Sequence, residues 1–177
     1  MYKIDKLLKQ DRKLFHTNDL GILWNITNKN TLYTAIKRFV QKGILIPLQK
    51  GLYSTIPIDR LDMVKLGMSL IHRYSYLSTE TILIQAGLIT QTVYPYTFVS
   101  DVSRKFHLDK YQFLTRKMHD KYLYNDTGIS KSGDLIQATP ERAVADLLYF
   151  NPKYHFDQRE MIDWKKVRQI RQEVGFI

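Results

Sequence analysis

One predicted helix concentrates hydrogen-bond donors and positive charge on a single face. In residues 31–42, apolar side chains recur at i, i+3, i+4, i+7 and i+8, the spacing of one stripe on an α-helix: Leu32, Ala35, Ile36, Phe39 and Val40. The opposite face has no acidic residue and consists of Tyr33, Thr34, Lys37, Arg38 and Gln41. Such a helix packs one side on a small core and offers the other to a polyanion such as DNA.

The side chains on this face also suggest how a duplex would be recognised. Arg38 and Lys37 suit guanine O6 and N7 in the major groove, whereas Tyr33 and Thr34 suit a thymine methyl group or a phosphate. Side chains at the helix ends and in a later turn would hold phosphates: Lys29, Asn30, Thr31, Gln41 and Lys50. A protein-docking surface is the alternative, but it would more often expose apolar residues here.

Two further helices and two strands are expected in the sequence on either side of this helix. Helices are expected over residues 2–10, 18–24 and 31–42, and two strands, 44–46 and 52–54, flank a turn at Lys50-Gly51. Thr17 suits the start of the second helix, Asn28 or Asn30 suits the start of the third, and Gly43 suits its end. Three helices and a two-stranded wing predict a winged helix-turn-helix over residues 1–57.

Positive charge is unevenly distributed along the chain. The 177 residues carry a formal net charge of +10. Residues 1–58 hold ten Lys and Arg against three Asp, a net of +7, while the rest hold 17 against 14, a net of +3. A field concentrated on one third of the chain favours a polyanionic partner there, although a basic surface can also serve solubility alone.

Residues 58–177 predict a second domain of mixed α+β structure. Helices are expected over 61–73, 78–86, 139–150 and 163–173, the third of them beginning at the strong start signal Thr139-Pro140-Glu141. Short segments rich in Tyr, Phe, Val and Thr between them predict strands: 92–100, 104–108, 112–118 and 121–124. The whole chain is therefore expected to be an α+β protein of two domains.

Residue types needed for catalysis or metal binding are absent or poorly spaced. There is no cysteine, the glycines form no phosphate-binding loop, and the five histidines never recur at helical metal-site spacing. The acidic pairs Asp59 with Asp62 and Asp157 with Glu160 are better explained as charges near helix N-termini. We therefore expect no enzymatic activity, no metal and no cofactor. With no apolar run of membrane-spanning length and no signal peptide, we expect a soluble cytoplasmic protein.

Two further groups of residues allow both a structural and a functional interpretation. The clustered tyrosines could form a stacking platform for single-stranded nucleic acid, but packing between strands is the more common role: Tyr74, Tyr76, Tyr94, Tyr96, Tyr122 and Tyr124. In the second domain, Glu141, Arg142 and Asp146 are the candidate functional positions. Arg142 and Asp146 are spaced i, i+4, so a mutual ion pair is the simpler expectation.

Three segments together resemble the AbiEi family of type IV antitoxins from abortive-infection systems. The first is Thr31–Leu45 with Lys50–Tyr53, the helix and its wing. The second is Tyr76-Leu-Ser-Thr-Glu-Thr-Ile-Leu-Ile-Gln-Ala-Gly-Leu-Ile89, similar to the family's "Y-[VL]-S-x-E-[ST]-A-L-x-x-x-G-L-I". The third, Ala138-Thr-Pro-Glu-Arg-Ala-Val-Ala-Asp-Leu-Leu148, is similar to "A-[ST]-P-E-R-A-[LV]-x-D". Many repressors share the first, whereas the second and third in this order are more telling.

The resemblance implies a protein with two activities. It would repress its own operon by binding inverted repeats in the promoter, and it would counter a co-encoded nucleotidyltransferase-like toxin, without requiring a stable complex with that toxin. Without the resemblance, the residues also allow an alternative function: a plain winged-helix transcriptional regulator whose second domain senses an effector or mediates dimerisation.

Overall fold

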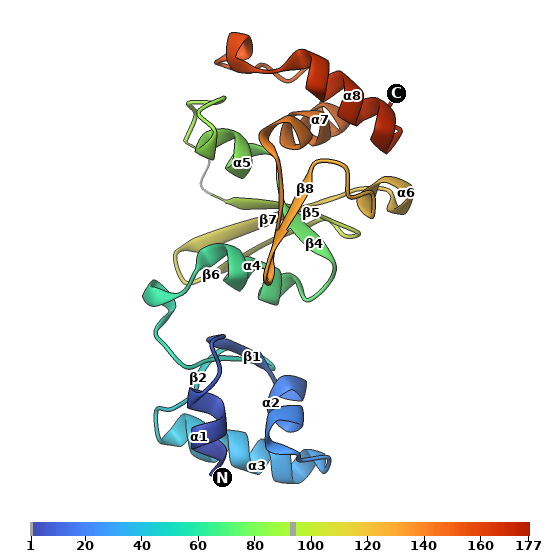
Figure 1. Ribbon diagram of the computed structural model, residues 1–177. Coiled ribbons are helices and arrows are strands. Elements are labelled where there is room, and N and C mark those ends of the chain that lie inside the picture. Colours follow the sequence, from blue (N-terminus) through green and yellow to red (C-terminus); the bar gives the residue numbers. More distant parts are fainter. Residues whose placement is uncertain (1, 93–94) are drawn as a thin grey trace. The chain divides into compact units, whose positions relative to one another are not determined.

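The chain forms two compact units, residues 1–70 and 71–177, in a computed structural model that describes residues 2–92 and 95–177. Those described residues contain eight α-helices and two β-sheets (Figure 1). The predicted mixed α+β class is confirmed. The boundary between the units lies within α4 (Met63–Ile71), whereas the sequence suggested a boundary between residues 57 and 58.

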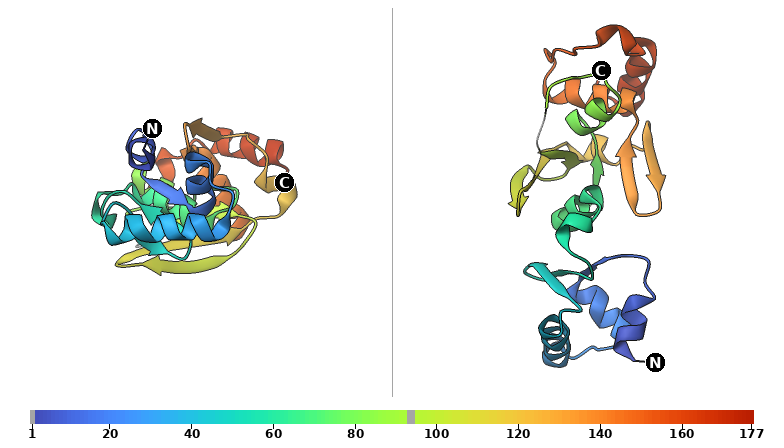
Figure 2. Two further views of the ribbon diagram at one scale, coloured as in Figure 1. Left: turned by 90° about the horizontal axis from the view of Figure 1, so that it is seen from below. Right: turned by 90° about the vertical axis from the view of Figure 1, so that its left-hand side faces the viewer.

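Unit 1 combines short helices with a small antiparallel sheet. Its strand order is β1-β3-β2, with β3 paired to both neighbours. In chain order its elements before α4 are α1 (Lys3–Leu8), β1 (Leu14–His16), α2 (Thr17–Trp24), α3 (Lys29–Gln41), β2 (Ile46–Gln49), β3 (Leu52–Ser54) and the 3₁₀ turn η1 (Ile58–Arg60). Figure 2 shows α1, α2 and α3 gathered on one side of these strands.

The core of unit 1 explains why α3 is fixed in place. Leu32 and Ile36 of α3 are buried with Phe15 and Leu20 in one apolar cluster. The rings of Trp24 and Phe39 lie 4.9 Å apart, which ties α2 to α3. The predicted apolar stripe is therefore the buried side of the helix.

Both ends of α3 are closed as the sequence suggested. The Asn28 side chain accepts a 3.0 Å hydrogen bond from the Thr31 backbone N–H, so Asn28 is the N-cap. Gly43 follows the helix with a φ of +68°, a conformation that glycine adopts without strain. For α2 the prediction was off by one residue, because His16 occupies the N-cap and Thr17 is the first helical residue.

Unit 2 is built on a six-stranded mixed sheet in the order β6-β7-β5-β4-β9-β8. Strands β5 and β7 are parallel, as are β4 and β9, and the other neighbours are antiparallel. The strands are β4 (Ser75–Leu77), β5 (Tyr96–Ser100), β6 (Arg104–Leu108), β7 (Tyr111–Lys117), β8 (Ile129–Ser132) and β9 (Leu135–Ala138). Helix α5 (Glu80–Gln85) lies between β4 and β5, and α6 (Asp120–Leu123) lies between β7 and β8. The last strand, β9, is followed by α7 (Pro140–Phe150), η2 (Arg159–Met161) and α8 (Trp164–Val174).

Helices α5, α7 and α8 lie on the same side of this sheet (Figures 1 and 2). Helix α7 packs against both α5 and α8. Its N-cap is Thr139, whose hydroxyl accepts from the Arg142 N–H, and α8 is capped in the same way by Asp163. Both helices were predicted with nearly these bounds, because each combines an apolar stripe with a clear capping residue.

Several predictions for unit 2 were wrong. Residues 121–124, expected to form a strand, belong to the short helix α6, whose start is capped by His119. Strands β4, β8 and β9 were not predicted. The strand expected over 92–100 begins at Tyr96, and residues 93 and 94 of that expectation lie outside the described residues.

In the described residues, no helix combines the length and the apolar character needed to cross a bilayer.

Candidate functional site

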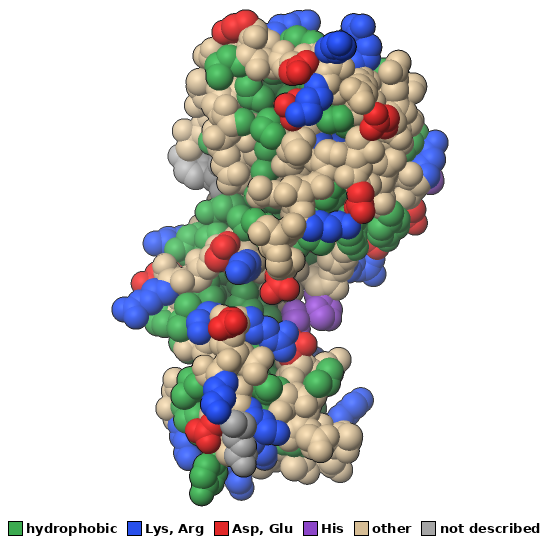
Figure 3. Space-filling view, viewed as in Figure 1, with side chains coloured by type: hydrophobic (Ala, Val, Ile, Leu, Met, Phe, Trp, Pro, Cys, Tyr) green, Lys and Arg blue, Asp and Glu red, His purple; other side chains and the backbone are tan. Residues whose placement is uncertain are grey.

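The predicted DNA-binding residues all lie on the surface of unit 1. Each of the nine is exposed: Lys29, Asn30, Thr31, Tyr33, Thr34, Lys37, Arg38, Gln41 and Lys50. Tyr33 is 55% exposed, which is unusual for a large aromatic side chain. In Figure 3, Lys and Arg side chains outnumber Asp and Glu on the visible surface of this unit.

The helix geometry arranges these side chains in a defined order. At about 100° per residue, Asn30, Thr34, Lys37 and Gln41 follow one line along α3, directly opposite the buried stripe. Tyr33 lies to one side of this line and Arg38 to the other. We call these six residues together the α3 outer face. It presents two cations, two amides, a hydroxyl and a phenol.

Within the described residues, no ion pair neutralises the positive charges on and beside this face. Helix α3 contains no acidic residue. Among the described residues, no carboxylate forms an ion pair with Lys29, Lys37, Arg38 or Lys50. An external anion would therefore not have to displace an internal partner.

The hydroxyl groups of Thr31 and Thr34 already donate hydrogen bonds within the protein. The Thr34 hydroxyl donates a 2.8 Å hydrogen bond to the Asn30 carbonyl, and the Thr31 hydroxyl donates to the Asn28 side chain at 3.2 Å. Thr34 consequently presents its methyl group and an acceptor oxygen to the outside. This arrangement fits contact with a thymine methyl group better than donation to a base.

Lys50 lies in the turn between β2 and β3, and the turn is held against the start of α2. Gly51 adopts a φ of +82° and its carbonyl accepts a 2.9 Å hydrogen bond from the Thr17 backbone N–H. The Thr17 hydroxyl approaches the same carbonyl at 3.4 Å. Thr17 thus positions the hairpin tip, a role that its sequence position did not suggest.

In unit 2, the candidate residues Arg142 and Asp146 are completely buried. The Arg142 Nε–H donates to Asp146 Oδ1 at 2.8 Å, and both side chains have no exposed surface. The mutual ion pair expected from their i, i+4 spacing is therefore present. In this arrangement neither side chain is accessible to a partner protein.

The Arg142 guanidinium uses all five of its N–H groups. Besides the bond to Asp146, it donates to the carbonyls of Asn125, Thr127 and Tyr122 at 3.0, 2.7 and 3.5 Å. The last N–H donates to the Tyr76 hydroxyl at 3.1 Å. Arg142 therefore joins α7 to β4 and to the loop around α6.

Ser78 and Tyr76 complete this network on the side of β4. The Ser78 hydroxyl donates to Asp146 Oδ2 at 2.8 Å. Burial raises the pKa of Tyr76 well above its ordinary value, and the Asp146 carboxylate adds to the shift, so the phenol stays protonated. Burial acts to lower the pKa of Arg142, but Asp146 and Tyr76 raise it overall, which keeps the guanidinium charged. Sequence reasoning singled out neither Ser78 nor Tyr76 for this role.

Glu141, unlike the adjacent Arg142, has a partly exposed side chain. Its carboxylate pairs with the Lys166 ammonium at 3.1 Å, and its side chain is 20% exposed. Burial acts to raise the pKa of Glu141, but hydrogen bonds from its own backbone N–H and from Lys166 lower it overall. Glu141 also borders a pocket of about 230 Å³ whose other lining residues are Ala86, Leu88, Pro140, Val144, Met161, Ile162 and Asp163.

The tyrosines of unit 2 serve mainly in packing. Tyr76 is fully buried, and Tyr74 lies between the rings of Tyr76 and Tyr124 at centroid distances of 6.4 and 5.1 Å. Tyr96 stacks on Phe113 at 5.8 Å. Tyr122 contacts the rings of Tyr149 and Phe176. Tyr94 of the predicted cluster lies outside the described residues.

Over the parts of the chain that are described, no group of three or more His, Cys, Asp or Glu side chains is arranged to hold a metal ion. In comparisons with known proteins, no protein family matches the chain and no curated protein shows significant similarity to it.

Proposed function

We propose that the chain binds duplex DNA through the α3 outer face. In this proposal unit 1 is a winged helix-turn-helix, in which α2 and α3 form the helix-turn-helix and the β2–β3 hairpin is the wing. Arg38 and Lys37 contact base edges, and Tyr33 and Thr34 contact a thymine methyl group or a phosphate. Lys29, Asn30, Thr31, Gln41 and Lys50 contact phosphates and set the register.

The observation that carries this proposal is the set of unpaired cations on a helix whose opposite side is core. Lys37 and Arg38 are exposed, and in the described part of the chain neither forms an ion pair. A protein-docking surface would favour exposed apolar residues at these positions. The outer face offers polar groups instead, with Tyr33 as its one large ring.

We further propose that the DNA bound is the chain's own promoter and that the protein is the antitoxin of a type IV pair. This part of the proposal rests on the AbiEi-like segments. Repression of the operon by binding inverted repeats, and neutralisation of a nucleotidyltransferase-like toxin with or without a stable complex, both follow from that resemblance. The role is cytoplasmic and non-enzymatic, and it requires no cofactor.

The DNA-binding part is tested with the full chain and a duplex from upstream of its reading frame. We expect tight, salt-dependent binding to this fragment and weaker binding to a shuffled fragment of equal length and composition. Specific binding typically exceeds non-specific binding by a factor of about 10³ to 10⁷. Equal affinity for the two fragments would contradict a specific repressor.

The antitoxin part is tested by co-expression with the adjacent reading frame. We expect that frame alone to arrest growth and co-expression with this chain to restore it. The matched control is a variant with intact unit 2 and both Lys37 and Arg38 replaced by alanine, which should still restore growth when both genes are expressed from unrelated promoters. A harmless neighbour would favour the alternative, a plain winged-helix regulator with an effector or dimerisation domain.

A further inference from the structure

A second group of unpaired cations lies on the β6–β7 hairpin of unit 2. Residues 102–118 contain one acidic residue, Asp109, and five cations: Arg104, Lys105, Lys110, Arg116 and Lys117. Arg116 pairs with Glu80. Within the described residues the other four cations form no ion pair. Elsewhere in unit 2, the exposed Lys131 and Lys166 are paired with carboxylates, whereas Lys165 and Arg168 form no ion pair within the described residues.

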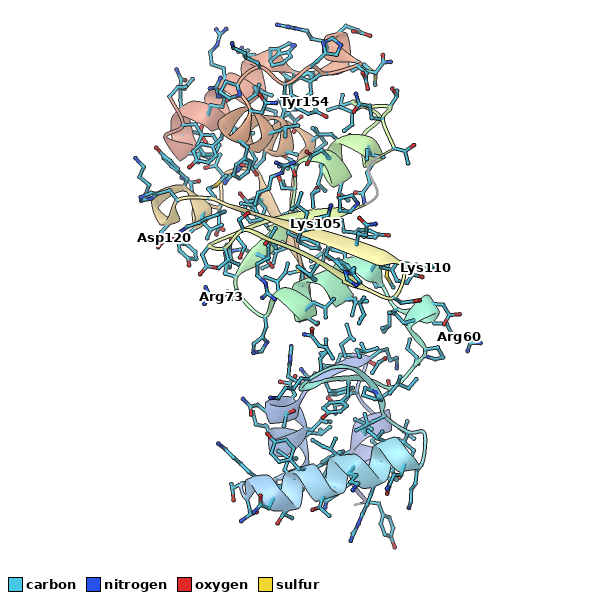
Figure 4. The ribbon with its side chains drawn as sticks, turned by 180° about the vertical axis from the view of Figure 1, so that it is seen from behind. Arg60, Arg73, Lys105, Lys110, Asp120 and Tyr154 are labelled. Atoms are coloured by element: carbon cyan, nitrogen blue, oxygen red, sulfur yellow. The ribbon has the colours of Figure 1, made fainter. Side chains whose placement is uncertain are left out.

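The hairpin presents these cations on an exposed antiparallel ribbon. Strand β6 is the edge of the sheet, and His107 pairs with Gln112 while Lys105 pairs with Leu114. Because paired residues share a face, Lys105, His107 and Gln112 lie together on one face of the ribbon, and all three are exposed. Figure 4 shows Lys105 on the hairpin and Lys110 at its tip.

Aromatic side chains stiffen the ribbon from its other face. Phe113 stacks on Phe106 at 5.4 Å and on Tyr96 at 5.8 Å, which ties the hairpin to β5. The Arg104 guanidinium lies 5.6 Å from the Phe106 ring centre, and the Lys110 ammonium lies 5.5 Å from that of Tyr111. Cations held over rings lose less freedom when they bind an anion.

Protection of a sheet edge explains only part of this charge. Lysines on an edge strand commonly prevent pairing with other chains. However, Gln112 and Lys117 belong to β7, which is an interior strand, and Lys110 lies in the turn. These residues do not shield the edge. Gln112 extends the face of Lys105 and His107, and Lys110 adds a positive charge at the turn, whereas Lys117 lies on the opposite face of β7.

From these observations we infer that the β6–β7 hairpin is a second duplex-DNA contact, with Lys105 and Lys110 bound to phosphates. Residues 113–117 of β7 pair with β5, so the hairpin is two-stranded only toward its turn. A two-stranded ribbon has the dimensions to lie in or along a DNA groove, which is about 12 Å wide on the major side. The inference builds on the proposed DNA binding by unit 1, but it assigns a separate set of residues. Unit 2 then adds to the affinity for DNA as well as carrying the proposed antitoxin activity.

The test compares two double variants of the full chain that remove the same charge. Lys105→Ala with Lys110→Ala removes the two ribbon lysines, whereas Lys131→Ala with Lys166→Ala removes two exposed lysines that already have carboxylate partners. The dissociation constant for a duplex of about 30 base pairs from the upstream region is measured from about 50 to 200 mM salt, the range over which phosphate contacts change affinity strongly. In a plot of the logarithm of the association constant against the logarithm of the salt concentration, the ribbon variant should have a slope that is shallower by about 1.8. Each phosphate contact contributes about 0.9 to this slope.

The outcomes separate this inference from the proposal for α3. Equal slopes for the ribbon variant and its control would overturn the ribbon contact and leave the α3 proposal standing. If the ribbon variant lowers the slope while Lys37→Ala with Arg38→Ala binds like the wild type, the α3 proposal would be overturned and the ribbon contact would stand. A loss confined to single-stranded DNA or RNA of the same length would overturn the assignment to duplex DNA. Absence of any binding by the wild-type chain would overturn both.

Discussion

The Ser78 hydroxyl donates a hydrogen bond to the Asp146 carboxylate and so joins two segments that are 68 residues apart in the sequence. Ser78 follows β4, and Asp146 lies in the middle of α7. The same two segments are joined again by the Arg142 guanidinium, which donates to the Tyr76 hydroxyl at 3.1 Å. Residues 76–89 and 138–148 therefore meet in one buried network, whose immediate role is to hold the helix, the strand and the α6 loop together.

Removal of the Arg142 guanidinium should strongly destabilise unit 2. Arg142→Ala leaves the Asp146 carboxylate buried without its charged partner, and breaking a buried pair in this way costs about 3–5 kcal/mol. The free energy of unfolding, measured in urea, should fall by that order. As the control, Lys131→Ala breaks a pair that is exposed on the surface, so its unfolding midpoint should stay near that of the wild type. Similar midpoints for the two variants would contradict the account of the network.

Gly128 should tolerate no side chain. It adopts a φ of +73°, and a Cβ atom at this position would lie 2.7 Å from the Cβ of Arg142. Gly133 is the matched control, since it has a φ of +57° but, apart from its chain neighbours, no described heavy atom lies within 4 Å of the position that its Cβ would occupy. Gly133→Ala should cost about 1–2 kcal/mol, the penalty of the left-handed conformation alone. Gly128→Ala should lower the unfolding free energy clearly further, and equal losses would show that the contact with Arg142 is unimportant.

Asp157 should make stability depend on pH in the acidic range. The Thr90 backbone N–H and hydroxyl donate to its carboxylate at 2.7 and 3.0 Å and lower its pKa. Its contribution to folding is thus complete above the ordinary aspartate pKa of about 3.9 and disappears as the pH falls through the lowered pKa. In urea unfolding, the difference between wild type and Asp157→Asn should be constant near neutral pH and shrink below about pH 4. A difference that persists unchanged in strong acid would refute this role.

The proposed wing residue Lys50 should affect all DNA sequences alike. Lys50→Ala removes one expected phosphate contact. The logarithm of the association constant should therefore fall less steeply with the logarithm of the salt concentration, with a slope shallower by about 0.9. The ratio of affinities for the upstream and the shuffled duplex should remain unchanged, because a phosphate contact carries no sequence information. Titration of both duplexes at several salt concentrations checks this. A change in the ratio would indicate that Lys50 reads a base.

The parts of the fold that could be predicted are those in which local signals agree. Helices α3 and α7 each combine a regular apolar stripe with a capping side chain, Asn28 or Thr139. Strand β4 has only three residues, all of them buried, so it shows no alternation. It exists because β5 and β9 pair with it on either side, and the sequence does not reveal such non-local pairing.

In the candidate sites, too, features that depend on local spacing were predicted, whereas features that depend on distant segments were not. The outward position of Lys37 and Arg38 follows from helical periodicity and was predicted correctly. The spacing of Arg142 and Asp146 likewise predicted their ion pair. Three of the other partners of Arg142 are backbone carbonyls of α6 and of the loop that follows it. Every residue type has a backbone carbonyl, so these partners cannot be recognised from the sequence. The depth of burial of this pair was therefore not apparent from the sequence.

The most direct test of the account is the affinity of Arg38→Ala for the upstream duplex. Arg60→Ala is the matched control, because Arg60 is also an exposed arginine of unit 1 but lies in η1, outside α3 (Figure 4). If Arg38 contacts a base, Arg38→Ala should weaken binding by about 1–3 kcal/mol and reduce the preference over the shuffled duplex, whereas Arg60→Ala should bind like the wild type. Equal binding by Arg38→Ala, Arg60→Ala and the wild-type chain would contradict DNA recognition by the α3 outer face.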